Sequence, residues 1–261
     1  MSSKGGELNT AERARAVADP VPTAVTGTRE RASEEEGMPR GRMFAMERVR
    51  SRDRDRLGYL FAKRVFDIAF SLVVILAALV PGAVLALLIR LETPGSPFYG
   101  QRRVGRVDPD GNPTYFTMWK FRSMVKDADK QLESLLEQNE VEGPMFKMHD
   151  DPRITRIGRF IRKHSIDEFP QFLNVLLGDM SVVGPRPPLP REVEEYDSWA
   201  MQRLAVKPGL TGPWQVGGRS DVDFDDMVRL DLGYITKRSI KTDLKLIAQT
   251  VLVVFTGKGA A

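Results

Sequence analysis

The sequence predicts a mostly α-helical fold with a small β-hairpin, in which a re-entrant helical hairpin associates with a membrane and interfacial amphipathic helices accompany a cytosolic domain. Three observations support this prediction. One long apolar run contains a Pro-Gly break, two β-prone stretches flank a strong turn, and apolar residues recur at helical spacing in most of the remaining chain. These patterns divide the chain into an N-terminal arm over residues 1–56, a membrane segment over 57–92 and a larger domain over 93–261.

The arm over residues 1–56 is predicted to be disordered. It is rich in Arg, Glu, Ala, Ser and Gly and has few aromatic or β-branched residues. It therefore has little apolar surface to offset the entropy lost on ordering.

Composition excludes several kinds of functional site. The 261 residues include no cysteine, which excludes disulfides, thiolate metal sites and cysteine nucleophiles. Only His149 and His164 are present, which disfavours a zinc site built from histidines. Lys and Arg number 39 against 35 Asp and Glu, a formal charge of +4. This modest basic excess suits an anionic membrane surface, nucleic acid or phosphorylated ligands, and does not choose among them.

The membrane segment is apolar from Ile68 to Ile89 apart from Ser71, Pro81 and Gly82, which is about the length needed to cross a bilayer as a helix. Pro81 removes a backbone hydrogen bond and Gly82 adds flexibility, so a break is expected there. The segment is either a kinked span or a hairpin that enters and leaves by the same face.

Charge on both sides of the segment favours the hairpin over the span, with a buried core helix as a third alternative. Lys63 and Arg64 come before it, and Arg90, Arg102, Arg103 and Arg106 follow it. A spanning helix normally has the cationic excess on one side only. Asp67 is expected at the interface or paired with a nearby cation, because a lone charge in lipid is costly.

The domain over residues 93–261 is predicted to begin with the β-hairpin. Its strands cover residues 98–104 and 114–121, around the strong turn signal DPDGNP at 108–113. The second strand carries Lys120, and Arg122 follows it. Helices are predicted over residues 124–141, 169–177, 192–205, 224–235 and 241–255.

A basic segment lies before the helix at 169–177. Arg153, Arg156, Arg159 and Arg162 recur every three residues, with apolar residues between them. This pattern fits an amphipathic helix in a headgroup layer, and it fits a solvated basic helix on an ordinary core equally well. Proximity to the membrane segment favours the interface.

Two adjacent acids, Asp167 and Glu168, follow this basic segment directly. A carboxylate among cations can act as a nucleophile toward phosphorus or bind a hard divalent metal. The alternative is structural, because Ser165 and Glu168 also fit a helix capping box. Further along, Arg186 lies between two prolines in a stiff loop, and Arg219 ends a Gly-rich loop. The Arg186 loop suits phosphate or nucleotide binding, and a plain structural loop is at least as common. The spacing of the loop that ends at Arg219 fits neither a Walker loop nor a dinucleotide fingerprint.

From Lys63 to about Phe255 the sequence resembles the bacterial sugar transferase family, the monotopic polyprenyl-phosphate phosphoglycosyl transferases. The resemblance is carried by six motifs in order: KRVFD at 63–67 before the Pro-broken segment, KFRSM at 120–124, SIDEFPQ at 165–171, GDMS at 178–181, VGPRP at 183–187 and KPGLTG at 207–212, followed by Gln215 and Gly218-Arg219. Each motif is weak alone, and the ordered series is specific.

The resemblance implies an enzyme that transfers a sugar phosphate from a nucleoside diphosphate sugar, UDP-sugar being expected, to undecaprenyl phosphate, with release of UMP. It implies that Asp167 is the nucleophile and forms a covalent aspartyl phosphosugar, that Mg²⁺ is the cofactor with Asp167 as a ligand, and that Glu168 supports the metal or positions the nucleophile. The phosphates or the nucleotide would be held by Lys120, Arg122, Arg162, Arg186 and Arg219. Pro81 would break the membrane hairpin.

The implied location is the bacterial inner membrane, with the active site facing the cytoplasm and no nucleic acid as partner; a homo-oligomer is allowed. The product would be the first lipid-linked intermediate of exopolysaccharide or glycoconjugate assembly. Two other classes stay open. One is a membrane-tethered basic protein that binds anionic lipid or nucleic acid without catalysis, and the other is a soluble nucleotide-sugar enzyme with a buried core helix.

Overall fold

The computed structural model describes residues 56–108, 112–132, 134–135, 148, 150–217 and 223–256. The arm before Arg56, His149, Arg219 and the end of the helix predicted over 124–141 lie outside these residues. The described helices and strands, in chain order, are α3 (Leu57–Glu92), β1 (Phe98–Val107), β2 (Pro113–Phe121), α4 (Ala128–Leu132), α5 (Arg156–Lys163), η2 (Ile166–Glu168), α6 (Gln171–Leu177), β3 (Ser181–Val183), α7 (Pro190–Glu194), η3 (Ala200–Ala205), β4 (Gly209–Thr211), α8 (Pro213–Gly217), α9 (Phe224–Lys237) and α10 (Ile240–Thr256). The described chain is therefore mostly helical, as predicted.

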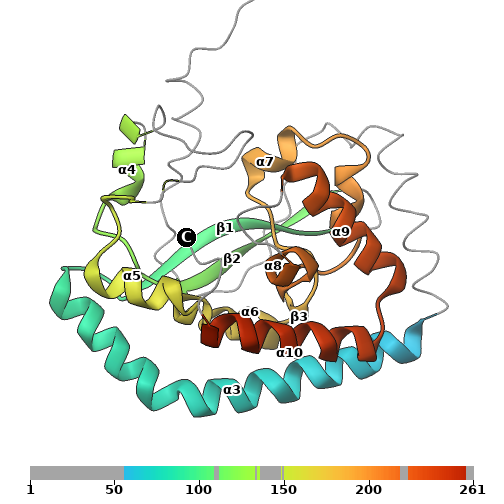
Figure 1. The fold of residues 1–261 in the computed structure, drawn as a ribbon, viewed down its shortest axis with the longest axis horizontal. Coiled ribbons are helices and arrows are strands. Elements are labelled where there is room, and N and C mark those ends of the chain that lie inside the picture. The colour runs from blue at the N-terminus through green and yellow to red at the C-terminus, as the bar shows by residue number, and fades with distance from the viewer. Residues whose placement is uncertain are drawn as a thin grey trace, which may run out of the picture.

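The predicted membrane segment forms α3, one continuous helix with Pro81 inside it. Figure 1 shows α3 as a single bent helix along one side of the molecule. Only 6% of the most apolar 18-residue stretch of α3 is buried within the protein. By length and composition α3 is compatible with membrane association. The expected break of the helix at Pro81 is not present, because the helix tolerates the lost hydrogen bond and continues past the proline.

The N-terminal end of α3 is bonded to the rest of the protein. Lys63 Nζ lies 2.8 Å from the Asp243 carboxylate of α10. The Arg64 guanidinium donates to the carbonyls of Val175 and Leu176, at 2.7 and 2.9 Å, and so caps the C-terminal end of α6. Lys63 and Arg64, which counted among the charges flanking the apolar segment, therefore attach α3 to α10 and α6.

The C-terminal end of α3 is bonded to the same body. The Glu92 carboxylate accepts hydrogen bonds from the backbone N–H groups of Arg156 and Ile157, at 2.9 and 3.2 Å, at the start of α5. Acidic side chains stabilise helix N-termini in this position. Both ends of α3 thus meet one folded unit, which in Figure 1 lies on the inner side of the bend.

Asp67 forms no ion pair within the described residues, so the predicted pairing with a nearby cation is wrong. It is 3% exposed, and its carboxylate accepts a hydrogen bond from the backbone N–H of Val182 at 3.0 Å. Without Asp67 the buried N–H of Val182 would lose this acceptor, so the hydrogen bond both satisfies the strand and attaches α3 to β3.

The predicted β-hairpin is confirmed as the antiparallel pair β1 and β2. Directly paired residues in such a ladder point to the same face, and successive residues alternate between faces. One face carries Tyr99 opposite Lys120, Gln101 opposite Met118 and Arg103 opposite Phe116. Arg103 and Lys120 therefore share a face.

The basic segment is only partly helical. Helix α5 begins at Arg156, after Thr155, whose hydroxyl accepts from the Gly158 N–H at 2.9 Å. Arg153 precedes the helix and is buried against Asp151, with a 2.6 Å ion pair. The predicted flank of four arginines is therefore wrong for Arg153, because a local acid pairs with it before the helix starts.

A second, parallel sheet of β3 and β4 was not predicted. Its two three-residue strands can lie close together because glycine occupies the point of contact on each side, Gly184 directly after β3 and Gly209 at the start of β4. A Cβ atom on Gly209 would lie 2.0 Å from the backbone nitrogen of Gly184, so only glycine permits this approach. The sheet brings the VGPRP and KPGLTG motifs side by side.

The helix predicted over 192–205 is wrong, since the chain forms α7 and then η3. Between them the Asp197 carboxylate accepts from the N–H groups of Trp199 and Ala200, at 3.0 and 2.8 Å, and so starts a new helical turn. The final two helices are confirmed as α9 and α10.

The largest core cluster lies between the hairpin, α6, β3, α9 and α10, and its buried members include Met118, Phe172, Val183 and Tyr234. Phe70, Val74 and Ile75 of α3 pack against it. A second cluster joins β1, η3 and α9. The apolar side chains of α3 are thus divided between this core and an exposed outer side.

Candidate active site

The adjacent acids lie on the short helix η2, between α5 and α6. Ser165, with a φ of 52°, turns the chain from α5 into η2. The predicted capping box is wrong, since the Ser165 side chain makes no capping bond. The carboxylate of Glu168 instead accepts from Lys120 Nζ at 2.9 Å.

Lys120 of β2 contacts both acids. Its Nζ lies 2.9 Å from Glu168 Oε1 and 3.7 Å from Asp167 Oδ2. Asp167 is 7% exposed, whereas the Glu168 side chain is 37% exposed. A buried carboxylate, a more accessible one and a shared ammonium group therefore form one cluster.

Burial raises the pKa of Asp167 above the usual value for an aspartic acid. The charge of Lys120 lowers this pKa, the charge of Glu168 raises it, and Arg162, half-buried on α5, lowers it. Lys120 and Arg162 therefore favour the ionised form that a nucleophile needs. The predicted grouping of Asp167, Glu168, Lys120 and Arg162 is present in the structure.

The same two carboxylates are the oxygen donors that a hard cation could use. Among the described residues, no group of three His, Asp or Glu side chains could hold a metal by itself. A Mg²⁺ ion usually takes one or two carboxylates together with phosphate oxygens of a substrate. Asp167 and Glu168 repel each other, and Lys120 offsets this repulsion. A divalent cation bound by both carboxylates would offset it in the same way.

One predicted phosphate-binding residue, Arg122, is bonded elsewhere. The Arg122 guanidinium donates to the carbonyls of Thr93 and Pro94, at 2.6 and 2.9 Å, beyond the C-terminal end of α3. Strand β2 ends at Phe121, so the alternation that positions Lys120 does not extend to Arg122. Arg219 lies outside the described residues.

Arg186 lies on a loop that is held along its whole backbone. Each carbonyl from Pro185 to Pro188 accepts a hydrogen bond from a different residue: Pro185 from the Gly209 N–H at 2.8 Å, Arg186 from Arg203 at 3.4 Å, Pro187 from Arg103 at 2.9 Å and Pro188 from the Val104 N–H at 3.0 Å. Proline rings restrict the same backbone. The direction in which Arg186 leaves the loop is therefore fixed.

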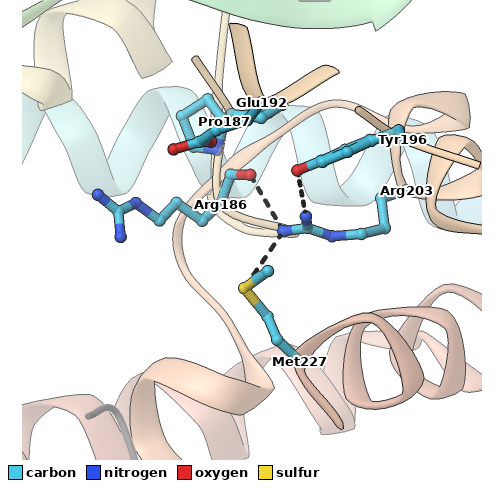
Figure 2. Close-up of a pocket in the computed structure, with 7 residues that line it drawn as sticks. Arg186, Pro187, Glu192, Tyr196, Arg203 and Met227 are labelled. Atoms are coloured by element: carbon cyan, nitrogen blue, oxygen red, sulfur yellow. Dashed lines mark hydrogen bonds between the residues drawn. The ribbon is translucent and has the colours of Figure 1, made fainter. Parts of the chain in front are cut away.

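Figure 2 shows the surroundings of this loop. Arg203 is buried and donates to the hydroxyl of Tyr196 and to the carboxylate of Asp231, both at 2.8 Å. The Arg186 side chain extends away from this cluster (Figure 2), and its guanidinium lies 5.8 Å from the ring centre of Trp214. The charged end of Arg186 is thus presented on the other side of the loop.

Arg103 and Arg203 are the two residues behind this loop that the sequence did not single out. In the sequence, Arg103 was considered only as one of the cations that follow the apolar segment. Its one usable signal is the strand alternation, which places it on the same hairpin face as Lys120. Arg203 has no comparable signal, because its partner Asp231 lies 28 residues away.

The sequence profile of the bacterial sugar transferase family matches residues 58–257. The chain is 48% identical over 208 residues to the galactosyl transferase CpsE of Streptococcus agalactiae, covering 78% of this chain and 44% of the relative. It is 38% identical over 204 residues to the exopolysaccharide production protein ExoY of Sinorhizobium fredii, covering 76% and 88%. It is 36% identical over 206 residues to the UDP-glucose:undecaprenyl-phosphate glucose-1-phosphate transferase of Escherichia coli, covering 76% and 41%. The chain thus spans less than half of the length of CpsE and of the Escherichia coli enzyme. With a family match over most of its described length and the motif residues assembled around η2, the chain belongs to the bacterial sugar transferase family.

Proposed function

We propose that the protein transfers a sugar 1-phosphate from a nucleoside diphosphate sugar to undecaprenyl phosphate, with a UDP-sugar as the expected donor and UMP as the leaving product. The observation that carries this proposal is the buried Asp167 beside Glu168, in contact with Lys120 and within the field of Arg162. The names of the relatives support the same reaction, since the Escherichia coli relative is a UDP-glucose:undecaprenyl-phosphate glucose-1-phosphate transferase.

The proposed chemistry has two displacements at one phosphorus atom. An oxygen of Asp167 bonds to the phosphorus that carries the sugar, the bond from this phosphorus to the bridging oxygen breaks, and UMP leaves. An oxygen of undecaprenyl phosphate then bonds to the same phosphorus and the bond to Asp167 breaks. The carboxylate is restored, and the product is a polyprenyl diphosphate sugar.

The side chains around Asp167 have separate roles in this proposal. Lys120 and Arg162 keep Asp167 ionised and neutralise charge on the phosphate oxygens. Arg186 holds the nucleotide part of the donor. Asp167 and Glu168 would hold Mg²⁺, which when bound neutralises charge on the donor diphosphate. Glu168 also fixes Lys120 through their 2.9 Å contact.

The lipid substrate requires the site to lie at a membrane surface, and we propose a re-entrant position for α3. Both ends of α3 are bonded to one body, which supports the placement of both ends on one side of the bilayer. Large apolar side chains on neighbouring helices are exposed as well: Phe160 on α5, Leu173 and Leu177 on α6, and Leu252 on α10. Together with α3 they would place η2 at the headgroup layer on the cytoplasmic side of the inner membrane.

Replacing Asp167 with Asn tests the proposal. Membranes with the wild-type protein should release UMP from a UDP-sugar when undecaprenyl phosphate is present, and the protein should become labelled by a donor radioactive in the sugar. Asp167→Asn should lose both signals and stay in the membrane fraction. The matched control is Asp225→Asn, an exposed aspartate at the start of α9, which should keep both.

Two outcomes would favour the other classes. A wild-type protein that binds anionic lipid or nucleic acid but releases no UMP from any nucleotide sugar would be a tethered binding protein. A protein that leaves the membrane in high salt without detergent would have α3 buried in a soluble assembly. Retained labelling in Asp167→Asn would remove Asp167 as the nucleophile.

A further inference from the structure

Arg103 differs from two other deeply buried arginines in how its charge is balanced. Arg153, Arg203 and Arg103 are each no more than 4% exposed. Arg153 pairs with Asp151 at 2.6 Å, and Arg203 pairs with Asp231 at 2.8 Å. Arg103 forms no ion pair with any carboxylate in the described part of the chain. The fold thus gives Arg153 and Arg203 a direct counter-charge and, among the described residues, gives Arg103 none.

The partners of Arg103 are neutral. Its Nε and Nη2 both donate to the side-chain oxygen of Gln101, and its Nη1 donates to the Pro187 carbonyl at 2.9 Å. Burial lowers the pKa of Arg103 to about 10, and the nearby charge of Arg186 acts in the same direction, whereas the charges of Glu192 and Glu168, which do not contact Arg103 directly, raise it. A buried cation with only neutral partners is costly, more so beside a second cation. Such a cost is expected where an anion binds.

The position of Arg103 identifies which anion this would be. It shares the hairpin face with Lys120, which contacts both acids. At its other side it holds the carbonyl of Pro187, the residue after Arg186. The charges of both Glu168 and Arg186 act on Arg103. Arg103 is therefore linked to the acid cluster through the hairpin face and to the Arg186 loop through Pro187.

We propose that Arg103 is a positioning residue for the donor diphosphate: it fixes the Arg186 loop through Pro187, and its unbalanced charge adds to the positive field that binds the phosphates. The proposal rests on the proposed function, in which the donor is a nucleoside diphosphate sugar. It adds a role for the neutral residue Gln101, which holds the guanidinium without cancelling its charge. A glutamate there would make the same hydrogen bonds and remove the unbalanced charge.

Gln101→Glu tests the charge separately from the geometry. The full-length variant in detergent should melt at or above the wild-type temperature, because a buried cation gains a counter-charge. Its Kd for UDP, measured by calorimetry, should rise about tenfold, or about 1.4 kcal/mol. The rise should be smaller for UMP, which has less charge. Gln131→Glu adds the same charge on the exposed surface of α4 and should bind UDP within about twofold of wild type.

A purely structural Arg103 predicts a different result. Gln101→Glu keeps both hydrogen bonds to Arg103, so UDP affinity equal to that of wild type would overturn the proposal. If Gln101→Glu fails to fold, Arg103→Lys and Arg103→Met replace it. The lysine variant keeps the charge and should bind UDP within about threefold of wild type, whereas the methionine variant should lose about tenfold or more. Equal loss in the two variants, or no loss in the methionine variant, would overturn the role of the charge.

The wild-type protein separates this inference from the proposed function. If wild type binds neither UDP nor UMP, the nucleotide donor is wrong and the proposed function fails. If wild type and Gln101→Glu bind UDP equally well, only the role of Arg103 fails.

Discussion

The ionisation of Asp167 should respond in opposite directions to the loss of Lys120 and of Glu168. The Lys120 ammonium lies 3.7 Å from the Asp167 carboxylate, and Coulomb's law gives an attraction of about 1 kcal/mol in a water-like medium and about 4.5 kcal/mol at an effective dielectric constant of about 20. Lys120→Met should therefore raise the pKa of Asp167 further. Glu168→Gln removes a negative neighbour and should lower it.

The assay is the single-turnover burst of UMP from a UDP-sugar without lipid acceptor, measured as a function of pH. Omitting the acceptor leaves its phosphate titration out of the profile. The nucleophile must be ionised, so the rate falls as the pH drops through the pKa of Asp167, and the raised pKa moves this fall to higher pH than for an ordinary aspartate. At pH values below the pKa of Asp167, the loss of about 1 kcal/mol of attraction predicts at least about sixfold less ionised Asp167 in Lys120→Met than in wild type.

The midpoint of the acid limb should move to higher pH in Lys120→Met and to lower pH in Glu168→Gln. Lys163→Met removes an exposed lysine of the neighbouring helix α5 and should leave the midpoint at its wild-type pH. A shift of both site variants in the same direction, or none in either, would refute the electrostatic assignment of Asp167.

Three further predictions concern the fold around the site. Gly58→Cys and Ser96→Cys, at exposed positions near the two ends of α3 in a chain without cysteine, should both react with an impermeant maleimide from the cytoplasmic side only; labelling from opposite sides would show that α3 spans the bilayer. Asp231→Leu should cost about 3–5 kcal/mol of unfolding free energy, because Arg203 loses its buried carboxylate; adding Arg203→Met should recover part of this loss in a denaturant titration, and no recovery would argue against an uncompensated charge as the cause. Arg122→Met should lower the melting temperature, because the carbonyls after α3 lose their donor; its KM for the donor should rise less than that of Arg162→Met, and the reverse order would place Arg122 in the phosphate site.

Local sequence signals were sufficient for the hairpin and for the last two helices. The turn between the β strands and the alternation along them depend on neighbouring residues, and α9 starts where Asp223 caps the Asp226 N–H at 2.7 Å. The parallel sheet could not be predicted in this way. Strands β3 and β4 have three residues each and are far apart in the chain, and their pairing depends on the close approach of Gly184 and Gly209.

The candidate site was predictable where a motif named the residues and not where their surroundings decide the geometry. The motifs that contain Lys120, Asp167 and Glu168, together with Arg162 of the basic segment before them, led to the cluster on η2. They did not indicate that Arg122 would be bonded to backbone carbonyls one residue past the strand. Nor did they indicate that Ser165 would adopt a left-handed conformation instead of capping a helix. Both outcomes depend on where an element ends, which is the least certain property of a sequence pattern.

The attachment of α3 to α10 affects the order in which this protein can assemble. The contact between Lys63 and Asp243 joins residues that are 180 positions apart. At about 5–20 residues per second, the ribosome needs roughly 10–40 s to synthesise the intervening chain. The contact with α10 is therefore made late in synthesis, and in a chain truncated before α10 this end of α3 would be held by Arg64 and Asp67 without Lys63.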